Sequence, residues 1–246
     1  MTIVTLLTDF GSADSYVAEV KAVLLSQVPG ARLVDISHDV SPGDVRSAQY
    51  LLSRAWHRFP NGTVHLAVVD PAVGTERRAI AAEAGQHRFV APDNGILSFL
   101  PSDARFVALP VPRAAAPTFH GRDVFAPAAA ALASGTRVDQ LGETIQQPHR
   151  SPLPKPRAES DGVVGEVVYV DRFGTLISNI PPDLVEPGIR IRVAGTDVGT
   201  LRRTFADAAR GTLVAFTGSG GTVEIAVRDG SAARLLGVGV GAEVKA

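Results

Sequence analysis

The sequence predicts an α/β N-terminal domain built on a mainly parallel sheet, followed by a smaller all-β, barrel-like C-terminal domain. Over the first half of the chain, short β-branched runs alternate with segments of helical periodicity, the pattern of a parallel sheet covered by helices. Four prolines then fall between Gln147 and Gly162, and beyond them short strand-like runs follow one another between Gly, Pro and Asp. We therefore predict domains at residues 1–150 and 162–246, joined by a Pro-rich linker at 151–161.

The N-terminal elements follow from local patterns. Residues 3–7 form a buried strand, Asp14 is placed to cap the next helix, and Pro29-Gly30 ends that helix. Asp44 is placed to open a second helix. Further strands are predicted at residues 32–36, 63–69, 79–84 and 88–90, and an Ala-rich helix at residues 125–133.

The C-terminal elements are short runs separated by turn-forming residues, which is typical of a barrel or sandwich. Short helical pieces are expected near residues 204–209 and 232–236. The strands are predicted at residues 163–170, 174–180, 189–193, 213–216 and 223–227.

Composition excludes several classes of protein. The 246 residues include 24 Lys and Arg against 25 Asp and Glu, without a basic cluster, so we expect neither a nucleic-acid nor a membrane partner. The absence of Cys rules out disulfides, thiolate metal sites and cysteine nucleophiles. The sequence shows no apolar stretch of about 18 residues and no signal-peptide pattern, and we expect a cytoplasmic protein.

The familiar nucleotide and hydrolase motifs are missing. The sequence holds no GxxxxGK[ST], no GxGxxG after the first strand, no HExxH and no GxSxG. The candidate site must therefore come from polar residues in the loops that follow strands.

Two carboxylates follow predicted strands. Asp9 and Asp70 fall at the carboxyl ends of strands, where ligands of α/β sheets gather. Asp9 is placed to accept both hydroxyls of a ribose, although an Asp at this place is also a common turn former. Arg77 follows Asp70 at a spacing that allows an ion pair, the alternative being a surface turn with solvated charges.

Two histidines lie in loops. His38 is by itself more typical of a structural residue. Asp123 is explained as the N-cap of the Ala-rich helix, which leaves His120 unexplained. A metal site holding Mg²⁺, Mn²⁺ or Zn²⁺ is the alternative for Asp9, Asp70 and both histidines, but their spacing lacks a ligand pair, so we expect no metal.

Seven ordered segments resemble one family, the S-adenosyl-L-methionine (SAM) hydroxide adenosyltransferases or adenosine-forming SAM hydrolases, which are relatives of the fluorinating and chlorinating SAM enzymes. The resemblance spans nearly the whole chain. The segments are TDFGSADSYVAEVK (8–21), DISHDV (35–40), VVDPAVGTERR (68–78), APDNGIL (91–97), TFHGRDVFAPAAA (118–130), DRFGTLISNI (171–180) and SGGTVEIAVRDGSA (219–232).

The resemblance implies hydrolysis of SAM to adenosine and L-methionine by in-line attack of water or hydroxide on C5′, with SAM as substrate and no cofactor. It also implies a homotrimer whose site lies between the N-terminal domain of one subunit and the C-terminal domain of the next. The catalytic set of hydroxide-using members matches Asp70, Arg77 and His120. A His held by a carboxylate can accept the proton of water, and an Arg stabilises hydroxide.

The same resemblance implies substrate-binding roles. Asp9 matches the residue for the ribose hydroxyls, Asp171 the one for the methionine ammonium and Ser219 the one for its carboxylate. Phe173 and Asn179 match the loop that meets adenine, and the backbone near Ala232 is expected to approach the base.

Two departures from the family pattern carry expectations of their own. Ala72 replaces a glycine and would be strained if that position needs a positive φ. Thr175 replaces an Asn that can pair with an adenine edge, so Asn179 or backbone groups would take over. The alternatives are a halogenase that makes 5′-halo-5′-deoxyadenosine and a non-catalytic SAM or adenosine sensor; the Asp–Arg–His set favours water over halide.

Overall fold

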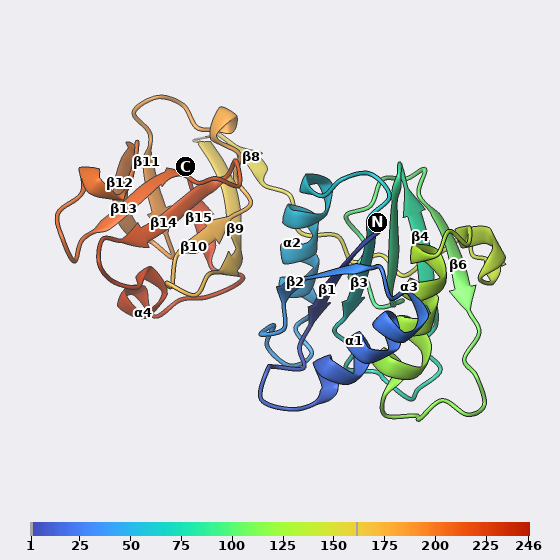
Figure 1. Cartoon of the computed structure of the whole chain (residues 1–246). Coiled ribbons are helices and arrows are strands. Elements are labelled where there is room, and N and C mark those ends of the chain that lie inside the picture. The colour runs from blue at the N-terminus through green and yellow to red at the C-terminus, as the bar shows by residue number, and fades with distance from the viewer. Residues whose placement is uncertain (1, 161) are drawn as a thin grey trace. The chain divides into compact units, whose positions relative to one another are not determined.

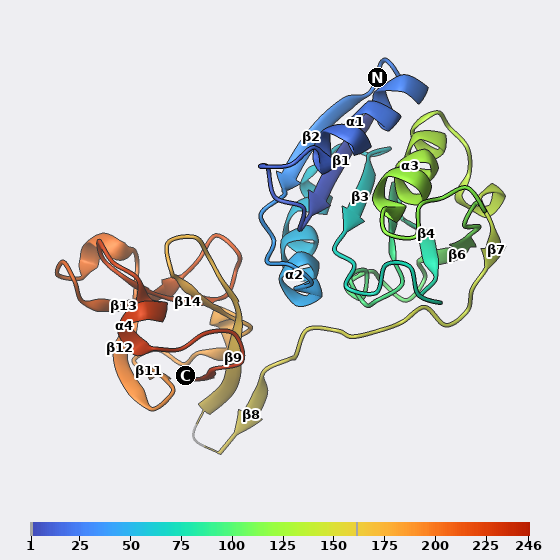
Figure 2. The same ribbon diagram turned by 90° about the horizontal axis from the view of Figure 1, so that it is seen from below.

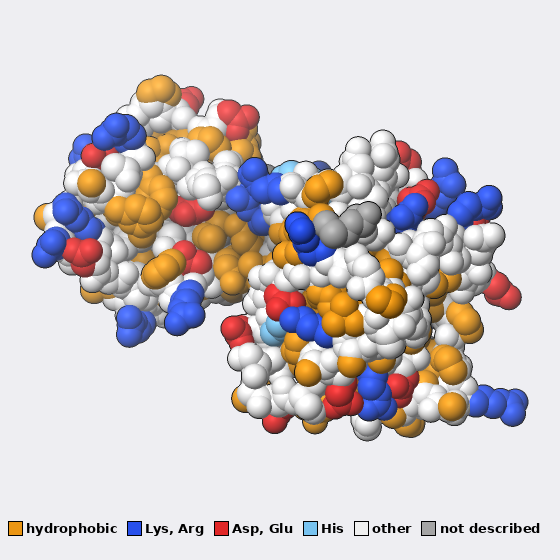
Figure 3. All heavy atoms as spheres, viewed as in Figure 1, with side chains coloured by type: hydrophobic (Ala, Val, Ile, Leu, Met, Phe, Trp, Pro, Cys, Tyr) orange, Lys and Arg blue, Asp and Glu red, His pale blue; other side chains and the backbone are white. Residues whose placement is uncertain are grey.

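The computed structural model describes residues 2–160 and 162–246 and divides the chain into two compact units, from the N-terminus to Pro152 and from Leu153 to Ala246. Each unit has its own hydrophobic core. Side chains of both charge signs are scattered over both units on the face shown in Figure 3.

The first unit is a seven-stranded sheet, within the described residues, with strand order β2-β1-β3-β5-β4-β6-β7 (Figures 1 and 2). One face packs against α1 and α3, and the other against α2. The elements are β1 Ile3–Thr8, α1 Tyr16–Gln27, β2 Arg32–Ser37, α2 Val45–Ala55, η1 Trp56–Arg58, β3 Val64–Val68, β4 Ala79–Ala84, β5 His87–Pro92, β6 Arg105–Leu109, η2 Gly121–Phe125, α3 Ala126–Ala133, η3 Val138–Gln140 and β7 Glu143–Thr144.

The predicted α/β class of this unit is confirmed, and its sheet is mixed. Strands β2, β1, β3 and β5 are parallel neighbours, whereas β4, β6 and β7 are joined to them by antiparallel pairings. The predicted strand pair around Gly85 forms the β4–β5 hairpin. Strands β6 and β7 were not predicted.

The predicted helix starts have different outcomes. Asp44 caps α2 as predicted, because its carboxylate accepts a hydrogen bond from the Ser47 amide at 2.9 Å. Asp14 does not cap α1, which begins at Tyr16 after Ser15. Asp123 is not an N-cap either: it lies inside the π-helical turn η2, and its carboxylate accepts from the Ala116 amide.

The second unit is a closed barrel of β9, β10, β14, β13, β12, β11 and β15, in which β10 pairs with β9 to close the ring. The predicted barrel-like class is therefore confirmed. Strand β8 pairs with β9 and lies within the segment predicted as a linker, whose residue 161 is outside the described residues. The elements are β8 Arg157–Glu159, β9 Gly162–Val170, β10 Leu176–Ser178, η4 Pro182–Leu184, β11 Arg190–Val193, β12 Thr196–Arg202, η5 Phe205–Asp207, β13 Leu213–Thr217, β14 Val223–Val227, α4 Ala232–Leu236 and β15 Glu243–Lys245.

Neither a membrane-spanning helix nor a cluster of metal-ligating side chains occurs among the described residues. None of their helices has the length and apolar character needed to cross a membrane. None of their His, Asp and Glu side chains gather in groups of three or more that could hold a metal ion.

Candidate active site

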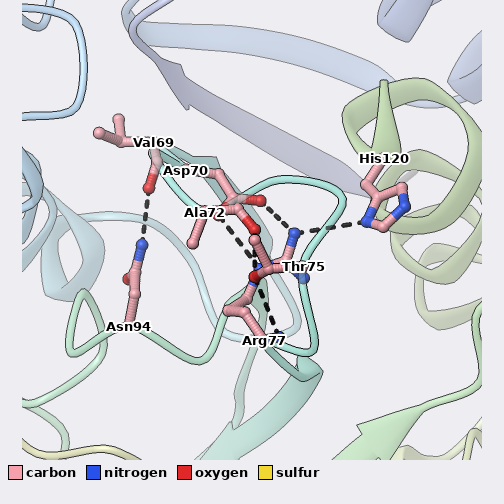
Figure 4. Close-up of polar contacts among 7 residues, drawn as sticks. All are labelled: Val69, Asp70, Ala72, Thr75, Arg77, Asn94 and His120. Atoms are coloured by element: carbon pink, nitrogen blue, oxygen red, sulfur yellow. Dashed lines mark hydrogen bonds and ion pairs between the residues drawn. The ribbon is translucent and has the colours of Figure 1, made fainter. Parts of the chain in front are cut away.

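A buried ion pair forms the centre of the candidate site (Figure 4). Asp70 lies two residues beyond the end of β3, and Arg77 returns to it at the end of the same loop. Arg77 Nε donates to Asp70 Oδ1 at 3.1 Å, and Arg77 Nη2 donates to Asp70 Oδ2. Their side chains are 6% and 5% exposed, so the predicted ion pair forms and the alternative of a solvated surface turn is wrong.

His120 joins this pair through the arginine. Arg77 Nη2 lies 3.4 Å from His120 Nδ1, and the imidazole is buried. Because arginine can only donate, the lone pair of a neutral His120 is on Nδ1 and its proton on Nε2. The contacts run from Asp70 to Arg77 to His120, so the carboxylate holds the histidine through the arginine.

Burial and the neighbouring guanidinium favour the neutral form of His120. Desolvation lowers the pKa of His120, the Arg77 guanidinium lowers it further, and the carboxylates of Asp70 and Asp123 act in the opposite direction. A neutral imidazole can accept a proton at Nδ1 from a bound molecule that displaces the long contact with Arg77 Nη2.

One donor of this centre is unused. Arg77 Nη1 is buried and has no hydrogen-bond partner among the residues that the structure describes. The guanidinium also lies over the Phe125 ring at 5.3 Å, which restricts its movement. The centre therefore offers one cationic donor and one basic nitrogen side by side.

The loop between Asp70 and Arg77 is closed by Thr75, which sequence analysis did not single out. Its hydroxyl donates to the Ala72 carbonyl at 2.8 Å and accepts from the Arg77 amide at 3.3 Å (Figure 4). Ala72 is not among the residues with positive φ, so the strain expected from the missing glycine is absent. The sequence signal for this turn is a Thr two residues before Arg77, a spacing typical of a side-chain turn.

Asp9 lies at the same sheet edge as Asp70, as predicted, because β1 and β3 pair in parallel with Thr8 opposite Val68. Asp9 Oδ2 accepts from the Gly43 amide at 2.8 Å. A side chain added at Gly43 would lie 3.4 Å from Pro71, so Gly43 contacts both loops.

His38 supports the Asp9 loop. Its Nδ1 lies 2.8 Å from the Thr8 hydroxyl, and its carbonyl accepts from the Gly11 amide. These contacts agree with the structural role that the sequence favoured for this histidine.

The second unit gathers three of the predicted binding residues around a hollow of about 950 Å³: Asp171, Phe173 and Ser219 line it together. Asp171 Oδ1 accepts from the amides of Phe173 and Thr175, while Oδ2 has no hydrogen-bond partner within the described part of the chain. Phe173 is 77% exposed, so its ring is available to a planar ligand.

The start of α4 closes one side of this turn. The Ala233 amide donates to the Gly174 carbonyl at 3.0 Å, which brings the backbone at Ala232 close to the Asp171 turn. The Ala232 side chain itself is buried in the barrel.

Asn179 is occupied elsewhere. Its Oδ1 accepts from the Glu166 amide at 2.8 Å, and its Nδ2 donates to the Pro154 carbonyl at 2.9 Å. Both ends of the amide thus bond to backbone, which favours a structural role, and its contact with adenine stays a prediction.

Fold and site together define a two-domain enzyme with an Asp–Arg–His centre in its α/β unit and a ligand-sized hollow in its barrel. Family models for the N- and C-terminal domains of SAM hydroxide adenosyltransferase match residues 4–142 and 165–245. The chain belongs to this family, which confirms the resemblance seen in the sequence.

Individual relatives agree with this assignment. The chain is 44% identical to the (R)-S-adenosyl-L-methionine hydrolase of Thermus thermophilus, over 97% of each protein, and 41% identical to that of Salinispora tropica, over 96% of this chain and 94% of the relative. A fluorinase of an Actinoplanes species is 29% identical over 76% of this chain and 74% of the relative. A solved structure of an uncharacterized conserved protein from Thermotoga maritima matches with a TM-score of 0.89 at 35% identity, covering 98% and 99% of the two chains.

Proposed function

We propose that this enzyme hydrolyses S-adenosyl-L-methionine to adenosine and L-methionine, using water held by Arg77 and deprotonated by His120. Three relatives named as hydrolases share 41–44% identity with the chain over nearly its full length, whereas the fluorinases are more distant. Water is therefore the proposed nucleophile rather than halide.

The pairing of an unused donor with an unprotonated nitrogen carries this proposal. A water molecule beside the centre can accept a hydrogen bond from Arg77 Nη1. It can donate to His120 Nδ1 by taking the place of Arg77 Nη2, which faces the lone pair of that nitrogen at 3.4 Å. Asp70 holds the guanidinium in place through two hydrogen bonds. The cation stabilises the developing hydroxide, since the pair is buried and weakly screened.

The reaction is a single displacement. The water oxygen forms a bond to C5′ while the C5′–S bond breaks, and the electron pair of the breaking bond goes to sulfur. The sulfonium leaves as the neutral thioether of methionine, so the leaving group needs no acid. The proton of water passes to His120 Nδ1 and from there to solvent.

Substrate binding is divided between the two units. In the first, Asp9 is the proposed acceptor for the ribose hydroxyls, at the same sheet edge as Asp70. In the second, Asp171 Oδ2 is the proposed partner of the methionine ammonium and Ser219 of its carboxylate. Phe173 is the proposed stacking surface for adenine.

The proposed assembly is a homotrimer in which the N-terminal domain of one subunit and the C-terminal domain of the next form each site. Support comes from the division itself, because the catalytic and methionine-binding residues lie in different units. A cytoplasmic location is part of the proposal, since a permanently charged sulfonium does not cross a bilayer unaided.

A product assay tests the reaction. The protein is incubated with the separate (R) and (S) sulfonium epimers of SAM, with and without chloride, in ¹⁸O-labelled water, and nucleosides are identified by mass. We expect ¹⁸O-adenosine, preferentially from the (R) epimer, in line with the names of the relatives. A 5′-chloro product contradicts the choice of water, and bound but intact SAM indicates a sensor.

A complementation assay tests the shared site. His120→Ala and Asp171→Ala are each expected to be inactive as homotrimers. If sites form between subunits, trimers assembled from an equal mixture regain roughly a quarter of wild-type activity, because that fraction of interfaces combines two intact halves. Sites within one chain would regain none.

A further inference from the structure

Asn94 is not used by the mechanism, yet it contacts the catalytic loop. It lies in the turn after β5, and its Nδ2 donates to the Val69 carbonyl at 2.8 Å (Figure 4). Its Oδ1 accepts from the Ile96 amide at 3.3 Å, which orients the amide so that its donor end faces Val69. Val69 is the residue immediately before Asp70.

The Val69 carbonyl needs this partner. The pairing of β3 with β1 ends at Val68, and its pairing with β5 ends at Leu66, so Val69 lies beyond both ladders. The residue is fully buried, and a buried carbonyl without a partner is costly. The hydrogen bond from Asn94 fixes the plane of the Val69–Asp70 peptide, which sets the direction in which Asp70 leaves the strand.

We propose that Asn94 is a positioning residue that aims the Asp70 carboxylate at Arg77 and thereby keeps Arg77 against His120. This inference rests on the proposed function for its kinetic consequence, but its geometric content does not depend on turnover. Without Asn94 the peptide plane can rotate, Asp70 turns away, and the guanidinium moves from His120.

An NMR titration of His120, in the whole chain without substrate, reports whether the Arg77 guanidinium lies beside the imidazole. The charged groups that act on His120 are Arg77, which lowers its pKa, and Asp70 and Asp123, which raise it. In Asn94→Ala the guanidinium moves away, so we expect the pKa of His120 to rise toward its ordinary value. An unchanged His120 titration overturns the proposal, whatever the protein does to SAM.

The kinetic readout is a fall in kcat of roughly tenfold to a hundredfold with KM within about threefold, and an acid limb of the pH profile displaced to higher pH. Asn94→Ser serves as the second variant if Asn94→Ala does not fold, because its shorter side chain also fails to reach Val69.

Thr63→Val is the matched control. It removes a side-chain hydrogen bond to the Pro60 carbonyl, at 2.7 Å, next to the opposite end of β3. We expect it to lower the melting temperature without altering kcat or the titration of His120. Equal kinetic losses in Thr63→Val and the Asn94 variants would show a general effect of stability and overturn the positioning role. Absence of adenosine from the wild-type protein would refute the proposed function alone, since the titration still decides on Asn94.

Discussion

Substitution of Gly74 by Ala is expected to separate the two halves of the proposed catalytic centre, Arg77 and His120. Gly74 lies in the loop between Asp70 and Arg77 and has φ +78°. A Cβ added there would lie 2.7 Å from the carbonyl oxygen of Pro117, three residues before His120. The close approach of these two backbone segments therefore holds Arg77 within 3.4 Å of His120.

The size of the effect follows from this geometry. A left-handed φ costs a non-glycine residue roughly 1–2 kcal/mol. Relief of the overlap with Pro117 requires a shift of about 0.5 Å between the two segments, since real carbon–oxygen contacts are longer. A displacement of about 1 Å at a catalytic centre can cost about a hundredfold in rate, so we expect Gly74→Ala to lose about tenfold in kcat.

The assay compares Gly74→Ala with Gly62→Ala. Gly62 has a similar φ, +86°, but nothing lies within 4 Å of its added Cβ. Both variants should lose similar backbone stability, measured by chemical denaturation, whereas only Gly74→Ala should lose kcat in the adenosine assay. Equal kcat values for the two variants would refute the reasoning that links Gly74 to the catalytic contact.

Four further outcomes are expected. Asp70→Asn leaves the buried guanidinium without its charge partner, so it should lower the free energy of unfolding by about 3–5 kcal/mol. It should also abolish most turnover, while the affinity for SAM, measured by calorimetry, stays unchanged. Burial lowers the pKa of His120, and the neutral form is the base, so the midpoint of the acid limb of kcat should lie below the ordinary pKa of histidine, about 6.5. A midpoint above that value contradicts this role. Burial lowers the pKa of His65 to about 3, so the folded protein does not bind a proton that the unfolded chain binds below about pH 6.5. The free energy of unfolding, measured by chemical denaturation, should therefore be about 2 kcal/mol lower at pH 5 than at pH 7. His65→Gln should reduce this difference, whereas His149→Gln, at an exposed site, should not. Ala72→Gly should destabilise by about 0.5 kcal/mol, since no positive φ is relieved; a gain in stability would contradict the observed backbone.

Local patterns in the sequence determined the two-unit order and most strands and helices. The alternation of apolar runs with helical periodicity reflects burial, which acts on neighbouring residues, and it placed β1, β3 and the β4–β5 hairpin correctly. The rule that ligands gather at the carboxyl ends of parallel strands also placed Asp9 and Asp70 at one edge. Strands such as β12 and β15 were missed because their side chains are mostly exposed or half-buried and carry little pattern.

Spacing along the chain also suggested the pair of Asp70 and Arg77, since seven residues suffice for a loop that returns on itself. Helix capping was less reliable: Asp44 caps α2, but Asp123 lies in a π-helical turn because its carboxylate accepts from the Ala116 backbone instead. A side-chain cap competes with tertiary partners that local sequence does not reveal.

By itself, then, the sequence determined the class of each unit, the sheet edge where Asp9 and Asp70 lie and the residue types of the proposed catalytic centre. Only the tertiary structure decided that His120 contacts Arg77 rather than a carboxylate and that Asn94 donates a hydrogen bond to the Val69 carbonyl. It also decided that both ends of the Asn179 amide bond to backbone. These contacts join residues that are far apart in the chain, and they depend on close approaches of backbone such as Gly74 to Pro117. Periodicity and spacing record which residues are buried, whereas the direction of a hydrogen bond is set by the packing of the whole unit.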